Sequence, residues 1–341
     1  IGSTGHLTSI RAIPDYSSSP WSPPPYADES LFTEEEVTLG HTDLVVPGTL
    51  TLPHTSPHTS RAAVVMLQGS GPADRNSSIG QLKPFKDLAW GLATRGIASV
   101  RFDKFTFVHP GKPMVNPTLD DEYVYHARAA IALLRSRPDL AELPIVVLGH
   151  SLGGTVAPRV GKREPSVAGL VILAGSTKPL HWTAIRQLQY LNMLKDKKHH
   201  VPKGVVDAAT KQAKFIDSPG LTLSTPSAKL PLDIPASFWL DIRDYNPVST
   251  AAELGKPMFV AQGGRDYQVT LKDDFAAWKA GLGGKSDVEF RVYGDMNHVF
   301  RAGTGMSSPE EYDVAGGHVD ADVVEDVARW IKELCDKGNG G

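Results

Sequence analysis

Short runs of apolar, often β-branched residues recur along the chain and alternate with segments whose apolar residues have helical spacing. The runs predict buried strands, and the segments between them predict helices with one apolar face. Strands are expected at 62–67, 97–102, 145–148, 167–173, 257–261 and 288–292, and helices at 86–94, 119–136 and 321–336. This alternation predicts an α/β fold with a mostly parallel sheet and helices on both of its faces.

The N-terminal part of the chain has a different pattern. Residues 35–39 and 44–52 predict two strands joined by a polar turn, which form an antiparallel hairpin. Residues 1–30 are rich in Pro and Ser and predict an extended arm, with Trp21 and Tyr26 available to dock it. We therefore expect an arm over 1–30 and one domain over 31–341.

One interval is too long for an ordinary connection between strands. About 80 residues separate Leu173 from Pro257, whereas a complete crossover unit needs roughly 30. Helical spacing appears around 183–196 and 205–216, followed by an aromatic segment at Phe238–Asp241. We predict a helical lid, an insertion over about 178–250 that covers the carboxyl edge of the sheet.

The strand at 145–148 leads directly into a candidate nucleophile. Ser151 lies between Gly149 and Gly153 in the pattern G-x-S-x-G, and a helix is expected to follow. Small residues on both sides allow the sharp strand-to-helix turn that exposes a serine hydroxyl. A Gly/Ser turn that matches the pattern by accident is the alternative, which the strand before and the helix after make less favourable.

A serine hydroxyl becomes nucleophilic when a base removes its proton and an acid orients the base. In this strand–turn–helix architecture the acid and then the histidine follow the nucleophile, on loops after later strands. Asp266 follows the strand at 257–261, and His298 follows the strand at 288–292. The alternative base is His318, and Asp295 is the alternative acid on the histidine loop. A turn or cap role is the structural alternative for Asp266.

Acyl transfer also requires backbone N–H donors aimed at the developing oxyanion. The N–H of Leu152, directly after the nucleophile, is one candidate. The second is the N–H of Ser70, in the glycine-rich loop after the strand at 62–67. A phosphate cradle is the alternative for this loop, but it lacks the lysine of a P-loop and the spacing of a dinucleotide fingerprint.

Composition narrows the classes of partner. The net charge is −3 and 21% of the residues are charged, which suggests neither a nucleic acid nor an anionic membrane. The single cysteine, Cys335, excludes an internal disulfide, and no metal-ligand spacing is present. No apolar run has the length of a membrane span or the pattern of a signal peptide, so we expect a cytoplasmic location. The oligomeric state is not encoded in any pattern that we identify.

With these residues placed, the chain resembles the α/β-hydrolase superfamily from about residue 32 to its end. It is most similar to bacterial serine carboxylesterases that carry H-G-S-G-P-x-D-R-D after the third strand and G-H-S-L-G-G at the nucleophile. The first motif stands here as Gln68–Asn76, and the phrases at 83–93 and Arg101–Lys104 also resemble that group. The chain departs from the group's pattern at Gln68, Asn76 and Phe105. The resemblance implies a helical lid and hydrolysis of carboxylic esters without a cofactor.

The sequence thus predicts a serine hydrolase that cleaves small or short-acyl esters through an acyl-enzyme intermediate. The same catalytic groups serve acyl transfer, lactone hydrolysis and peptide hydrolysis, and a non-catalytic binding relative is a further alternative. Candidate substrate contacts are the side chains or backbone of Gln68, Gly69, Trp182, Tyr190 and Trp239.

Overall fold

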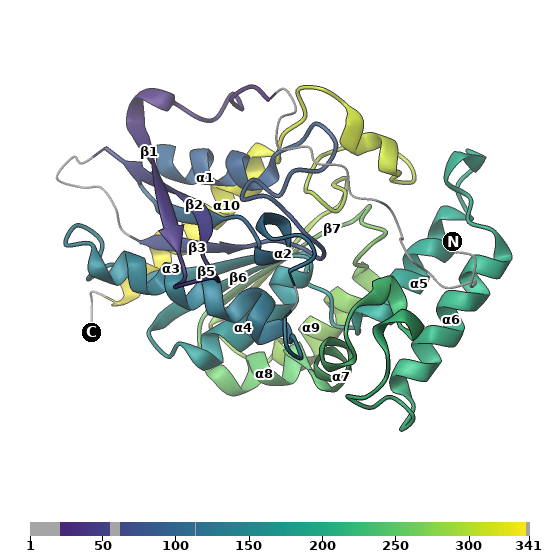
Figure 1. Cartoon of the computed structure of the whole chain (residues 1–341). Coiled ribbons are helices and arrows are strands. Elements are labelled where there is room, and N and C mark those ends of the chain that lie inside the picture. The colour runs from purple at the N-terminus through teal and green to yellow at the C-terminus, as the bar shows by residue number, and fades with distance from the viewer. Residues whose placement is uncertain (1–20, 55–61, 113, 339–341) are drawn as a thin grey trace.

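The computed structural model describes residues 21–54, 62–112 and 114–338, which form an eight-stranded mixed sheet flanked by helices (Figure 1). The strands are β1 (Phe32–Leu39), β2 (Val46–Pro53), β3 (Ala63–Leu67), β4 (Ala98–Phe102), β5 (Ile145–His150), β6 (Val167–Leu173), β7 (Met258–Gly263) and β8 (Val288–Tyr293). Their spatial order is β1-β2-β4-β3-β5-β6-β7-β8. The hairpin β1–β2 is antiparallel and β2 pairs antiparallel with β4, whereas every later pair is parallel. The predicted fold class is confirmed.

Helices cover both faces of this sheet. On one face lie α1 (Pro84–Thr94) and α10 (Ala321–Gly338); on the other lie α3 (Tyr125–Ser136), α4 (Leu152–Arg163), α8 (Pro247–Leu254) and α9 (Ala276–Leu282). Strand β3 shows why both faces need cover, because Val65 and Leu67 enter one core cluster while Val64 and Met66 enter the other. A strand that is apolar on both sides must be buried on both sides.

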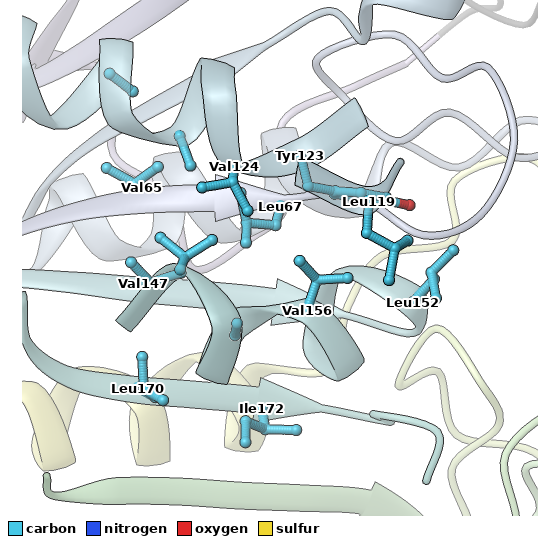
Figure 2. Packing of buried hydrophobic residues seen from close by; sticks show 14 of the residues in the cluster. Val65, Leu67, Leu119, Tyr123, Val124, Val147, Leu152, Val156, Leu170 and Ile172 are labelled. Atoms are coloured by element: carbon cyan, nitrogen blue, oxygen red, sulfur yellow. The ribbon is translucent and has the colours of Figure 1, made fainter. Parts of the chain in front are cut away.

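The core beneath the candidate nucleophile is continuous between β5, β6 and α4. Val147 of β5 and Leu170 and Ile172 of β6 lie with Val156 of α4 in one cluster, and all four side chains are fully buried (Figure 2). Complete burial of one such side chain stabilises a fold by about 1.5–3 kcal/mol. The first turn of α4 is therefore fixed to the sheet by packing.

The insertion between β6 and β7 contains the helices α5 (Leu180–Leu191), α6 (Lys203–Asp217) and α7 (Ala236–Asp244), which precede α8. Figure 1 shows them gathered on one side of the molecule, in teal and green. Helices α5 and α6 pack against each other through apolar side chains, Ile185 and Leu188 of α5 and Ala209 and Ala213 of α6.

Several boundaries differ from the sequence prediction. The helix expected at 183–196 ends at Leu191, because the Asn192 side chain turns the chain by hydrogen bonds to the backbone N–H and C=O of Val201. The helix expected at 119–136 consists of a π-helical turn, Asp120–Val124, followed by α3. The short helix α2 (Phe105–Val108) and helices α8 and α9 were not predicted.

The end of the N-terminal arm docks on α1 and on the segment before α10. The Trp21 indole N–H donates to Asp87 Oδ1 at 2.8 Å, and the Tyr26 hydroxyl donates to the carbonyl of Val319 at 2.8 Å. Trp21 also packs edge-on against Trp90, with ring centroids 4.9 Å apart. The remainder of the predicted arm, residues 1–20, lies outside the described residues.

Candidate active site

Ser151 occupies a sharp turn between β5 and α4. Its backbone has φ 56° and ψ −122°, a conformation that residues with a Cβ seldom adopt. A Cβ on Gly149 would lie 2.2 Å from the carbonyl oxygen of Gly153, and a Cβ on Gly153 would lie 2.1 Å from that of Leu67. Only glycine fits at these two positions, which lets strand and helix approach closely enough to present the serine.

His298 and Asp266 meet on neighbouring loops after β8 and β7. The distance from His298 Nδ1 to Asp266 Oδ2 is 2.6 Å, and the two side chains are 5% and 0% exposed. Because a carboxylate only accepts hydrogen bonds, His298 donates from Nδ1. A neutral ring in this tautomer leaves Nε2 unprotonated and able to act as a base.

The carboxylate of Asp266 is held from several directions. Its Oδ1 accepts the backbone N–H groups of Gln268 at 2.8 Å and Val269 at 3.0 Å. The Gln262 amide donates to Oδ2 at 2.8 Å and to the Val269 carbonyl at 2.9 Å. These hydrogen bonds provide donors for both oxygens of the buried carboxylate, and they fix the orientation of Asp266 toward His298.

The two alternative residues lie elsewhere. Asp295 is exposed, and the backbone carbonyl of Asp295, rather than its side chain, bonds Gly303 and Arg265. His318 donates to Asp87 at 3.1 Å beside Trp21, in the docking contact of the arm. Asp266 and His298 form a hydrogen-bonded pair, and neither Asp295 nor His318 takes part in it.

His150 links the serine turn to the histidine loop. Its Nε2 donates to the carbonyl of His298 at 2.8 Å, and the two rings have centroids 4.7 Å apart. Burial, assisted by the nearby His298, lowers the pKa of His150 to about 3. His150 is therefore neutral at ordinary pH and serves as a hydrogen-bond bridge between β5 and the base loop.

The loop after β3 borders the serine directly. A Cβ on Gly69 would lie 3.3 Å from Ser151 Cβ and 3.7 Å from Ser151 Oγ. Ser70 follows and is exposed, while Leu152 begins α4 and is buried. The two predicted oxyanion donors thus belong to two elements that adjoin Ser151, the loop that contains Gly69 and a helix N-terminus that favours negative charge.

The predicted substrate contacts differ in how their polar groups are used. Gln68 is buried and donates from its amide to the carbonyl of Asp74 in its own loop and to the carbonyl of Phe102 at the end of β4. On the insertion, the Trp182 indole donates to Asp217 at 2.7 Å. Tyr190 donates to the Ser307 carbonyl at 2.8 Å, and its ring stacks on Tyr267 with centroids 4.5 Å apart. Trp239 is 2% exposed and meets His181 edge-on.

Comparison with known proteins shows the family to which the chain belongs. Residues 61–300 match the family described as serine aminopeptidase, S33. The chain belongs to this family of α/β-hydrolases. It is 35% identical over 308 residues to esterase EstD of Thermotoga maritima, an alignment that covers 90% of this chain and 69% of that protein.

Solved structures of other α/β-hydrolases share the fold at low identity. Brefeldin A esterase, described as a bacterial homologue of human hormone-sensitive lipase, has a TM-score of 0.58 at 16% identity and aligns over 94% of this chain and 81% of its own. An esterase of Pyrococcus furiosus has a TM-score of 0.54 at 17% identity, with 92% and 96% of the two chains covered. At these identities the likeness shows the fold alone.

One support of the histidine loop in this hydrolase was not predicted. Asn297 is fully buried, and its side-chain oxygen accepts the N–H groups of Val299 at 3.1 Å and Arg301 at 3.2 Å. Its amide donates to Glu311 at 2.7 Å, and Glu311 in turn pairs with Arg265, the residue before Asp266. In the sequence, the polar residue Asn297 next to His298 was the only indication of this support, because its partner Glu311 is remote in sequence.

Within residues 21–54, 62–112 and 114–338, no group of three or more His, Cys, Asp or Glu side chains is arranged to hold a metal ion. The helices of the same residues include none with the length and apolar character needed to span a membrane.

Proposed function

We propose that this α/β-hydrolase is a serine carboxylesterase in which Ser151, His298 and Asp266 form the catalytic triad. The 2.6 Å hydrogen bond between buried Asp266 and His298 carries the proposal, because it fixes the imidazole tautomer that a serine nucleophile needs. The esterase relative that is 35% identical supports hydrolysis of carboxylic esters in particular.

The reaction follows from the roles of these groups. His298 Nε2 takes the hydroxyl proton while Ser151 Oγ attacks the ester carbonyl, and Asp266 stabilises the imidazolium that forms. The N–H groups of Ser70 and Leu152 bind the oxyanion. His298 then protonates the leaving alcohol, and it later activates the water that releases the acid from the acyl-enzyme.

The insertion is proposed to act as the lid and to shape the substrate pocket. Its helices are tied to the loops of the catalytic edge, since Tyr190 of α5 stacks on Tyr267, the residue after Asp266. Trp182 and Tyr190 would limit the acyl or alcohol group, and Trp239 would act from the core by packing beneath the insertion. Gln68 and Gly69 would shape the pocket from below. Small or short-acyl esters are the proposed substrates.

Peptide hydrolysis is a second candidate because the matching family is described as a serine aminopeptidase family. The proposed triad can cleave an amide by the same acyl-enzyme route. Acyl transfer and lactone hydrolysis use the same groups, and a binding protein would retain the fold without turnover.

The deciding experiment measures kcat/KM for p-nitrophenyl esters of increasing acyl length, beside an aminoacyl anilide and a lactone. Fluorophosphonate labelling is measured with wild-type protein and Ser151→Ala. The proposal expects the highest kcat/KM on short esters, and labelling and turnover that vanish in the variant. Preference for the anilide would make the chain a peptidase, and an absence of turnover on all substrates would leave a binding protein.

A cytoplasmic location and independence from nucleic acids remain predictions of the sequence. Cell fractionation and a nucleic-acid binding assay test them.

A further inference from the structure

A buried lysine next to the loop after β3 has no role in the steps above. Lys104 ends the phrase Arg101–Lys104 that resembles the bacterial esterases, and its side chain is only 2% exposed. An ammonium group is costly to bury unless its protons are all bound.

Each of the three ammonium protons has an acceptor. Lys104 Nζ lies 2.8 Å from Glu122 Oε1, 2.9 Å from the Tyr123 hydroxyl oxygen and 3.1 Å from the carbonyl oxygen of Gly69. Burial by itself lowers the pKa of Lys104, but Glu122 and Tyr123 outweigh it and hold the pKa above its usual value. The side chain is therefore a fixed positive charge at neutral pH.

The Gly69 carbonyl receives a second donor. The Tyr123 hydroxyl donates to it at 2.7 Å, so both lone pairs of this oxygen are used. Burial raises the pKa of Tyr123, which keeps the hydroxyl protonated as a donor. Two bonds, one of them from a cation, fix the direction of this carbonyl.

The direction of that carbonyl sets the direction of the next N–H. A trans peptide is planar, so the C=O of Gly69 and the N–H of Ser70 point in opposite directions. Gly69 borders the nucleophile, since a Cβ added to it would lie 3.7 Å from Ser151 Oγ. The peptide that Lys104 and Tyr123 hold is thus the one that supplies the second proposed oxyanion donor.

We propose that Lys104 and Tyr123 are positioning residues for acyl transfer. They hold the Gly69–Ser70 peptide with its N–H toward the oxyanion, and the Lys104 charge polarises the peptide so that this N–H becomes a stronger donor. Glu122 holds the ammonium in place. The inference rests on the proposed serine hydrolase reaction and adds to it a charged support behind the oxyanion site.

The test uses two changes that differ in severity. Lys104→Met combined with Glu122→Gln removes the ion pair without leaving a buried carboxylate unpaired. It should lower kcat by about 10–100-fold with KM within about threefold, somewhat less than the 10²–10³ typical of losing an oxyanion donor outright. Tyr123→Phe removes one hydrogen bond and should lower kcat by about 3–10-fold.

A second measurement reports the oxyanion site itself. A trifluoromethyl ketone forms a tetrahedral adduct with a serine nucleophile, and its affinity should fall in parallel with kcat in both variants. The matched control is Arg101→Met, which removes a different buried cation, in β4, whose ion pair is with Glu34, 2.7 Å away. The control should lower Tm and keep kcat within about threefold.

The outcomes separate this inference from the proposed function. Folded variants at Lys104/Glu122 and Tyr123 that keep kcat and ketone affinity within about twofold of wild type would overturn the positioning role. Phosphonylation of Ser151 also develops charge on an oxyanion, so labelling rates decide the positioning role even if wild type hydrolyses no ester. A wild type that neither labels nor turns over refutes both proposals.

Discussion

The carboxyl edge of the sheet and the insertion beside it are held in place by different means. At the edge, Gly149 and Gly153 allow backbone contacts that no other residue permits, and packed aliphatic side chains fix α4 below them. The insertion shares that apolar core through Phe238, Trp239 and Ile242 of α7. It adds polar attachments between side chains far apart in sequence, such as Arg159–Asp241 and Arg186–Asp274. The backbone contacts at the edge allow one geometry, whereas these polar attachments are separate bonds that can be changed one at a time.

This difference suggests that the two regions have separate roles in catalysis and in substrate binding. Changes at the edge should remove the chemical step, and changes in the insertion should alter how substrates bind while the chemical step survives.

The largest effect is expected from the base. His298→Ala should lower kcat by more than about 10³-fold, because nucleophile and base act as one unit. His318→Ala is the matched control, since that ring bonds Asp87 in the arm contact, and it should keep kcat within about threefold. Steady-state rates on one short ester measure both variants, and a reversed order would move the base to the other loop.

The next largest effect on kcat is expected from the proposed acid, Asp266. Asp266→Asn should lower kcat by roughly 10³–10⁴-fold, the scale seen when the orienting carboxylate is lost and the imidazole tautomer is wrong. Asp295→Asn should stay within about tenfold of wild type, because that side chain is exposed. The measurement is kcat for both at neutral pH; a larger loss at Asp295 would contradict the assignment of the acid.

An attachment of the insertion should give a smaller effect of a different kind. Arg186 donates to buried Asp274 at 2.7 Å, which also accepts the N–H groups of Thr177 and Thr270. Arg186→Met should lower Tm by a few degrees and kcat/KM by about tenfold, mainly through KM, because the carboxylate keeps its other donors. Differential scanning calorimetry and ester kinetics measure these quantities.

The matched control for Arg186 is Lys203→Met. Lys203 forms an exposed pair with Asp207 within α6, where such a pair contributes little. If Arg186→Met lowers kcat as much as Asp266→Asn does, the proposed separation of roles between the edge and the insertion is wrong.

The smallest effect on the reaction is expected from the titration of His150, which changes stability at acidic pH. The pKa of His150 is about 3 in the fold, against about 6.5 in an unfolded chain. Between those values the unfolded chain binds more protons, so the free energy of unfolding falls as the pH is lowered through this window. Urea unfolding at pH 7, 6, 5 and 4 measures the slope.

His150→Gln should flatten that slope, because the substituted chain has no imidazole to protonate. His41→Gln, at an exposed position in the turn between β1 and β2, should leave it as in wild type. Equal slopes in wild type and His150→Gln would assign the acid sensitivity to other groups.

The contrast between the two regions also explains what the sequence could predict. Strand β5 and the glycines around Ser151 carry local signals, so the elbow, the sheet and the order of Asp266 and His298 could all be located along the chain. Strand order then implied that the two loops are neighbours, which the 2.6 Å contact agrees with. The assignment of catalytic roles to them remains a prediction.

Contacts between distant polar residues gave no such signal. The bond from Lys104 to Gly69 and the bond from Asn297 to Glu311 depend on which loops meet in space, and neither spacing nor periodicity encodes that. The helix α8 was missed because Pro247–Leu254 is short and its Ala251 is buried against α4 only after the insertion has folded back. Packing between elements, rather than local propensity, decided these features.

The backbone of Ser151 has a consequence for how this protein can evolve. A residue with a Cβ at φ 56° and ψ −122° holds roughly 1–3 kcal/mol of conformational strain, which glycine would relieve. With Ser151 as the proposed nucleophile, selection for thermal resistance alone would favour its replacement by glycine, and selection for turnover would retain the serine. A Ser151→Gly form would then be more stable and inactive, one substitution away from the proposed enzyme.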